Sequence, residues 1–387
     1  AYEMLRSLVG SEMCIRDSLK LSRVISLTKD AIADQLAGPD ASAGSGEAGA
    51  GSAVWKANFA APASAAWHSS LSPVLASLDL FNPSYSTGQE VTTDLYLIND
   101  SWHAANIHVD LLLTTECPEL IPEAECLDRP AARWSHDFDL PADSLRTTPI
   151  AWQLPDEEGS YWLTARTTGL TGRPVLSQRF VRAVAPPQIP ERAKRRTFVV
   201  LGGSDSATEW FAAHGLSVTT SVEELDPAAH EVVVWEPSHL TADERRRAAA
   251  LCEFAARGGR VVVLATPKWD WRGLCDVRVP EASPMSRVFA ATGAEAHPML
   301  AGVRPDWLQR WNGLPGTVAI GSIEGPGLDA GRALLWAVEP KRVVVAEVAA
   351  AQGGGTVLFC QLAIRGHVLP DATYDPVADR ILANLLA

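Results

Sequence analysis

From Leu71 onward, apolar and polar residues alternate with period two in a series of short runs. Such alternation is typical of strands that bury one face in a core. Segments rich in Gly, Pro, Asn and Asp separate the runs and predict turns. The expected strands are Val74–Phe81, Val91–Ile98, Ile107–Leu113, Trp134–Leu140, Ile150–Leu154, Tyr161–Ala165 and Val175–Val184. Their number and spacing predict an immunoglobulin-like β-sandwich over residues 71–184.

The pattern changes after residues 185–196, APPQIPERAKRR, which form a Pro-rich and charged linker. Continuous β-branched runs follow at 197–201, 231–235 and 260–265, as expected of parallel strands covered on both faces. A helix is predicted between the last two runs, with a capping box at Thr241 and Glu244.

The remaining pattern completes a second domain over residues 197–387. Further strands are expected at Thr317–Ile320, Ala333–Ala337, Val343–Val348 and Thr356–Leu362, and a closing helix at Asp375–Leu386. The segment AAAQGGG between the last two strands suits an antiparallel hairpin at a sheet edge. The second domain is therefore predicted to be a doubly wound α/β domain of flavodoxin-like or class I amidotransferase-like type.

The first 70 residues lack such patterns. Residues 1–18 have no helix or strand period and look like translated adapter read-through, so they are set aside as non-native; this leaves open where the natural N-terminus lies. Residues 19–70 are expected to be a flexible lead-in, because the Gly/Ala/Ser-rich stretch 39–53 buries too little apolar surface to order itself.

Charge and hydropathy exclude two classes of partner. The net charge of the 387 residues is −13, and the one compact basic run, Arg192–Arg196, lies in the linker, so nucleic-acid binding is not expected. The sequence contains no apolar run of 18 residues, so no membrane helix is predicted. Charged residues interrupt residues 1–20, so no secretory signal is predicted either. A soluble protein is expected, with cytoplasm, periplasm or exterior left open.

The cysteines predict no metal site or cofactor. No C-x-x-C or zinc-type Cys/His spacing occurs. Cys117 and Cys126 flank one loop, where a disulfide and two free thiols are equally good interpretations.

A nucleophile is also hard to place. Ser204 follows a predicted strand, but the turn lacks the last glycine of G-x-S-x-G, so Ser204 or Asp205 is better interpreted as a helix N-cap. Amidotransferase chemistry needs a cysteine in a tight turn after a central strand, whereas Cys252, Cys275 and Cys360 fall in a helix, a loop and a strand. No catalytic residue is therefore assigned.

Tryptophans supply the candidate contact residues. Trp269 and Trp271 lie with Asp270 and Arg272 after the carboxyl end of a predicted strand, where α/β sheets bind ligands. Trp307 and Trp311 are spaced i,i+4 and are expected on one helical face. An interface between domains is the favoured interpretation, and stacking against a glycan is the alternative.

Several segments resemble a known family. LSPVLASLDLFNPSYSTGQEVTTDLYLINDS, with its Asn99-Asp100 turn, is similar to the segment that follows the catalytic barrel in bacterial family 2 glycoside hydrolases, the β-galactosidase, β-mannosidase and β-glucuronidase group. HPMLAGV, LQRWNG, GGGTVLFCQL and DPVADRILANLL resemble the degenerate amidotransferase-like α/β domain that follows in some large members. The resemblance covers about residues 71–387.

This resemblance implies a non-catalytic C-terminal region of a bacterial glycoside hydrolase that acts on β-linked glycans. The family's catalytic glutamates lie in a barrel that has no match here, so that barrel is the expected partner, with glycan as a further one. Two alternatives stay open. One is a stand-alone carbohydrate- or protein-binding module that uses the tryptophan loops; the other, least supported, is a degenerate amidotransferase-like hydrolase that uses Ser204 or a cysteine.

Overall fold

The computed structural model describes residues 69–121, 123–169, 173–189, 191–194, 197–202, 205–219, 225–227, 232–236, 242–264, 269–271, 275–280, 282–313, 315–329, 331–337, 342–350 and 354–386. The predicted read-through, most of the lead-in, Ser204, Thr241 and Arg272 lie outside these residues. Strands predominate over helices, so the expected β-rich fold is confirmed.

Contacts divide the chain into two units. Unit 1 comprises Ala1–Leu78, Asp94–Ile150 and Trp162–Arg179, and unit 2 comprises Asp79–Thr93, Ala151–Tyr161 and Phe180–Ala387. Unit 2 therefore includes one end of several early strands together with the second half of the chain. The predicted boundary at residues 185–196 stays a prediction.

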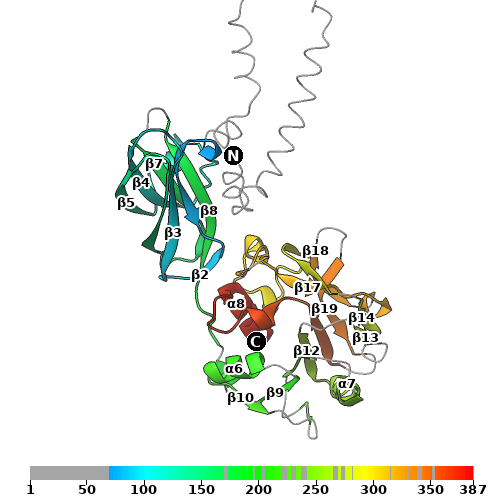
Figure 1. Ribbon diagram of the computed structural model, residues 1–387. Coiled ribbons are helices and arrows are strands. Elements are labelled where there is room, and N and C mark those ends of the chain that lie inside the picture. The colour runs from blue at the N-terminus through cyan, green and yellow to red at the C-terminus, as the bar shows by residue number, and fades with distance from the viewer. Residues whose placement is uncertain are drawn as a thin grey trace, which may run out of the picture. The chain divides into compact units, whose positions relative to one another are not determined.

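The first half of the chain forms two sheets (Figure 1). Their strands are β1 (Val74–Asp79), β2 (Ser84–Ser86), β3 (Glu90–Asn99), β4 (Ala105–Thr114), β5 (Ala132–Leu140), β6 (Ser144–Gln153), β7 (Gly159–Thr168) and β8 (Val175–Val184). One sheet has the order β1-β3-β6 and the other β2-β8-β7-β4-β5. All seven predicted strands are present.

Strand β2 lies where the sequence predicts a turn. It pairs in parallel with β8, with Ser84 opposite Arg182. Three residues are too few to show an alternation, so only the pairing partner makes this segment a strand.

Strand β4 places the residues of the candidate site. Ile107, Val109 and Leu111 are buried on one face, and His108 and Asp110 project from the other. Further along the outer face, a small cluster around Leu112, Leu127 and Leu176 lies under the segment 115–131. Asp110 is buried on this outer face although it is polar, in contact with Arg133 and Ser135 of β5.

Unit 2 contains an eight-stranded sheet with the order β10-β9-β11-β12-β20-β19-β18-β16. Its strands are β9 (Thr197–Gly202), β10 (Ser217–Thr219), β11 (Val232–Glu236), β12 (Arg260–Leu264), β16 (Val288–Ala290), β18 (Arg332–Ala337), β19 (Arg342–Ala349) and β20 (Thr356–Cys360). The parallel strands β9 to β12 and β20 lie in the chain order 2-1-3-4-5.

The predicted hairpin of β19 and β20 is antiparallel, as expected. Its predicted place at a sheet edge is wrong, because β18 and β16 continue the sheet beyond β19. The run Val288–Ala290 is too short to be predicted as a strand.

Helices cover both faces of this sheet. Val200, Val234 and Val262 belong to one core cluster with residues of α6 (Asp205–Ala213) and α8 (Pro376–Leu385). The alternate residues Val199 and Val233 pack with α7 (Ala242–Ala256) in a second cluster. This confirms the prediction made from the continuous β-branched runs.

Helix α8 begins where the sequence predicts. The Asp375 side chain accepts a hydrogen bond from the backbone N–H of Val377 at 2.9 Å, and Pro376 occupies the first helical position. Val377, Ile381 and Leu385 are buried at helical spacing.

The other elements are short. They are α5 (Glu191–Lys194), β13 (Trp269–Trp271), β14 (Val277–Val279), β15 (Ala282–Met285), β17 (Ala319–Gly321) and the 3-10 helices at Glu125–Leu127, Pro298–Leu300, Pro305–Leu308, Pro326–Leu328 and Ile364–Gly366. Of the helices in the described part of the chain, none has the length and apolar character to cross a membrane.

Candidate functional site

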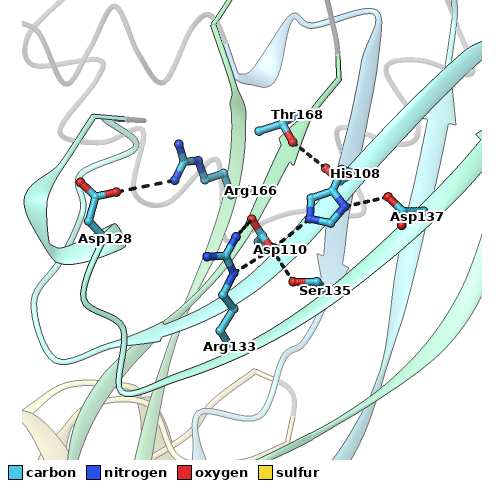
Figure 2. Close-up of polar contacts among 8 residues, drawn as sticks. All are labelled: His108, Asp110, Asp128, Arg133, Ser135, Asp137, Arg166 and Thr168. Carbon is cyan, nitrogen blue, oxygen red and sulfur yellow. Dashed lines mark hydrogen bonds and ion pairs between the residues drawn. The ribbon is translucent and has the colours of Figure 1, made fainter.

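A cluster of charged and polar side chains lies on the outer face of the five-stranded sheet (Figure 2). His108 and Asp110 come from β4, and Ser135 and Asp137 from β5. The register sets His108 opposite Asp137 and Asp110 opposite Ser135. Because residues two apart on a strand share a face, all four side chains meet on one surface.

Asp110 is the centre of the cluster, with a side chain that is 5% exposed. Its carboxylate accepts hydrogen bonds from Arg133 Nε at 3.0 Å, Arg133 Nη2 at 2.6 Å and Ser135 Oγ at 2.6 Å. Burial alone would raise the pKa of this carboxyl, but the bonds from Arg133 and Ser135 outweigh burial and hold the pKa below its usual value. Asp110 is therefore ionised at neutral pH.

His108 lies between two carboxylates. Its Nδ1 is 2.7 Å from Asp137 Oδ1, and its Nε2 is 3.2 Å from Asp110 Oδ1. The hydrogen bond with Asp137 raises the pKa of His108; burial opposes this shift, and the charge of Asp110 adds to it. The arrangement favours an imidazolium that donates to both carboxylates.

Serine, histidine and aspartate occur together here, but not in the order that nucleophilic catalysis needs. A catalytic serine hydroxyl donates to the histidine, which is held by the aspartate. Here Ser135 Oγ donates to Asp110, and both nitrogens of His108 face carboxylates. Within the described ranges, no group of three or more His, Cys, Asp or Glu side chains is arranged to hold a metal ion. The cluster is an ion-pair network that joins β4 to β5.

The same network extends toward the segment 115–131. Arg166 of β7 lies 4.0 Å from Asp128, and Arg173 Nε donates to Glu123 at 2.9 Å. These ion pairs hold the segment 115–131 over Leu112 and Leu176, beside the polar cluster around Asp110.

The stability of unit 1 is expected to depend on the protonation of His108. Since its pKa is raised in the folded state, its contribution is complete below the unfolded pKa of about 6.5 and is lost as pH rises through the folded pKa. His108→Gln should abolish this pH-dependent loss of stability, as measured by unfolding curves at a series of pH values. Asp137→Asn should lower the pKa of His108, as measured by NMR.

His103→Gln, at an exposed position, is the matched control and should leave the pH profile unchanged. A His108 pKa at or below about 6.5 at low salt would contradict the assignment. Added salt should reduce the shift, because Asp137 is 86% exposed.

Two of the predicted tryptophan contacts are core residues. Trp307 and Trp311 are 1% and 0% exposed. The predicted common helical face is wrong, since the 3-10 helix Pro305–Leu308 ends before Trp311. Trp307 Nε1 donates to Ser160 Oγ at 3.3 Å and Trp311 Nε1 to the Trp307 carbonyl at 3.2 Å, so neither indole offers a face to a sugar.

The other candidates, Trp269, Asp270 and Trp271, form β13, which pairs with β14. Their side chains and Arg272 lie outside the described residues, and so does Ser204. The structure therefore brings Trp307 and Trp311 together and does not test the remaining four candidates.

No disulfide occurs among the described cysteines, so Cys117 and Cys126 are not bonded to each other. Burial raises the pKa of Cys275 to about 11 and that of Cys360 to about 12, and it also raises the pKa of Cys252. Such thiols are protonated at neutral pH and are poor nucleophiles.

Unit 2 contains a second polar network, and it is buried. Asp375 Oδ2 accepts from Ser84 Oγ at 2.7 Å and from the backbone N–H of Asn312 at 2.9 Å. The Asn312 side chain accepts from the Ser84 N–H at 2.9 Å and donates to the carbonyls of Ser84 and Tyr374 at 2.7 and 2.6 Å. Asn82 accepts from the Gly313 N–H at 2.9 Å. Three segments far apart in the chain are thereby joined.

Arg182 lies in the same part of unit 2 and is 0% exposed. Its guanidinium donates to the carbonyl of Gln309 at 2.6 Å, to that of Asp306 at 3.4 Å and to that of Arg310. Burial lowers the pKa of Arg182, and the charges of Asp375 and Asp306 oppose this shift. The buried cation therefore holds the turn after Pro305 against β8.

Neither network was predicted from the sequence. The spacing of His108 with Asp110, and of Arg133, Ser135 and Asp137, already showed two polar rows on strands. Only the pairing register could show that the rows adjoin. Arg182, by contrast, resembles the outward residue of an ordinary alternating strand.

Comparisons with known proteins give little further guidance. No protein family and no curated protein matches the chain. Among solved structures, the CARDB domain of the PF1109 protein from Pyrococcus furiosus, in complex with di-metal ions, is similar over 29% of this chain and 94% of that chain, at 12% identity and a TM-score of 0.22. A TM-score this low establishes neither a shared ligand nor a shared activity.

Proposed function

We propose that this chain is a non-catalytic accessory region of a multidomain glycoside hydrolase acting on β-linked glycans, and that it supports a catalytic barrel. One observation carries the proposal: three of the segments that resemble family 2 glycoside hydrolases meet in the buried network of unit 2. FNPSYS supplies Asn82 and Ser84, LQRWNG supplies Asn312 and Gly313, and DPVADR supplies Asp375.

This convergence fits a supporting role. Ser84, Asn312 and Asp375 are buried and Asn82 and Gly313 are partly buried, and their hydrogen bonds to one another support a structural role. Buried polar networks of this kind favour one arrangement of the segments that they join. A region that has to hold a neighbouring domain needs such a fixed geometry.

The fold gives further support. We assign the first two sheets to an immunoglobulin-like sandwich and the eight-stranded sheet to a degenerate amidotransferase-like domain. The 2-1-3-4-5 order of its parallel strands is that of flavodoxin-like doubly wound sheets. The raised pKa values of Cys252, Cys275 and Cys360 agree with a domain that has no thiol nucleophile. The alternative of glycan binding by tryptophans loses Trp307 and Trp311, which are buried.

The proposal is tested first on the purified chain. It is expected to release no aryl alcohol from aryl β-glycosides above the rate of a buffer control, since the catalytic glutamates would reside in the barrel. Turnover with kcat of about 1 per second or more would overturn it.

The second test examines the coding sequence upstream of residue 19. The reading frame upstream of residue 19 is expected to encode a barrel with paired glutamates, and adding the purified chain to that barrel should raise its thermal stability. A start codon with its own promoter next to residue 19 would count against the proposal.

A further inference from the structure

Strand β5 is the last strand of its sheet, as Figure 1 shows at the outer side of the sandwich. One side of β5 pairs with β4 over its whole length, from Ala132 opposite Leu113 to Leu140 opposite Ala105. The other side has no neighbouring strand in the described structure, so its backbone N–H and C=O groups form an edge. With nine residues this edge is longer than the typical strand of about 5 to 6.

The sequence of this edge, ARWSHDFDL, is complementary to itself in the antiparallel direction. In an antiparallel pairing centred on His136, each residue of one copy faces the residue of the second copy that lies equally far from His136 on its other side. Arg133 then faces Asp139 of the second copy, and Ser135 faces Asp137 of the second copy. Trp134 faces Phe138 of the second copy. Opposite charges and aromatic pairs at facing positions are the pairs that stabilise antiparallel strands.

Neighbouring registers are worse. Moving the centre to Asp137 sets two Asp137 carboxylates against each other, and like charges at facing positions are destabilising. Moving it to Ser135 sets Arg133 against Asp137, but Asp139 and Leu140 then face residues 131 and 130, which lie outside the strand. The register centred on His136 is the one that pairs all nine residues and leaves no facing like charges.

The exposure of β5 suits this contact. Arg133, Ser135, Asp137 and Asp139 are exposed on the outer face, while Trp134, His136 and Phe138 are half-buried on the inner face. The rings of His136 and Phe138 stack with centroids 6.1 Å apart. A second strand beside β5 would cover the exposed part of this aromatic row.

Arg133 has enough N–H donors to bind Asp110 of its own chain and Asp139 of the second copy together. Asp110 accepts hydrogen bonds from Nε and from one N–H of Nη2 of Arg133, and the Arg133 side chain is still 56% exposed. A guanidinium has five N–H donors, so further donors remain for Asp139 of the second copy.

We propose that β5 pairs antiparallel with β5 of a second copy of this chain, about a two-fold axis at His136. The two five-stranded sheets then form one continuous ten-stranded sheet. A single strand edge buries less than the roughly 1,200 Å² of a standard interface, so the dimer is weak and forms at high micromolar protein concentration. This inference is independent of the function proposed above.

Sedimentation velocity of the full chain should show a concentration-dependent monomer–dimer equilibrium. Asp139→Arg, which sets a second guanidinium against Arg133 of the other copy, should weaken dimerisation at least about tenfold. Asp94→Arg makes the same charge change at an exposed position of β3 and should leave the equilibrium unchanged. A chain that stays monomeric up to about 500 µM would overturn the proposal, and so would unaltered dimerisation of Asp139→Arg.

The register is tested by cross-linking. Under mild oxidation, His136→Cys should give a disulfide-linked dimer in which peptide mass spectrometry finds residue 136 joined to residue 136. Trp134→Cys and Phe138→Cys should cross-link with each other when mixed and not with themselves. Each variant is first checked for the native circular dichroism spectrum, and a link between introduced cysteines other than 136–136 or 134–138 would overturn the register.

Discussion

Replacing Arg182 by methionine is expected to lower the free energy of unfolding of unit 2 by about 3 kcal/mol. Methionine fills the volume of the aliphatic stem but donates no hydrogen bond. The carbonyls of Asp306, Gln309 and Arg310 would then lose the guanidinium of a side chain that is itself 0% exposed. Each buried acceptor left unpaired costs about 1 to 3 kcal/mol. Removing the buried cation also removes its desolvation penalty, which offsets part of this loss.

Urea unfolding followed by tryptophan fluorescence measures this change, because Trp307 and Trp311 lie in the core of unit 2. Arg365→Met alters an exposed arginine and should change stability by less than about 0.5 kcal/mol. If Arg182→Met were as stable as the parent protein, the hydrogen bonds would do no more than offset the burial of the charge.

Replacing Asp375 by alanine is the second change with a large expected effect, also about 3 kcal/mol. The carboxylate accepts three hydrogen bonds, from Ser84 Oγ, the Asn312 N–H and the Val377 N–H. The substitution removes the N-cap of α8 and leaves these donors without an acceptor at once. Asp329→Ala, at an exposed position, is the matched control and should have little effect.

A double-mutant cycle separates the two roles of Asp375. Ser84→Ala removes the hydroxyl but leaves the helix cap intact. The coupling energy between Ser84→Ala and Asp375→Ala is expected to be about 1 kcal/mol, within the range for side chains in direct contact. Additive effects would show that the hydrogen bond from Ser84 does not contribute to the stabilisation by Asp375.

Much of the fold could be predicted from local pattern. The period-two runs predict β1 and β3 to β8, and the helical spacing of Val377, Ile381 and Leu385 predicts α8. What local pattern lacks is pairing: it could not show that β2 is a strand or that β19 lies inside the sheet, because both depend on segments elsewhere in the chain. The cluster around Asp110 escaped prediction for the same reason.

The tryptophans show the opposite error. Trp307 and Trp311 are predicted as contact residues because their i,i+4 spacing suggests that two large aromatic side chains share one helical face. In the structure, their indole N–H groups find partners in Ser160 and in the Trp307 carbonyl, so the rings are buried at little cost. The spacing of the two tryptophans in the sequence does not reveal that their rings lie inside a core.

The bond between Ser84 and Asp375 joins residues 291 positions apart. During synthesis, Ser84 leaves the ribosome long before its partner exists, so β2 and the turn around Asn312 cannot reach their final arrangement while the chain is growing. Contacts of such high sequence separation slow folding and leave intermediates exposed. Helix α8 therefore completes a structure begun at β2, and unit 2 reaches its native state only after translation has passed Asp375.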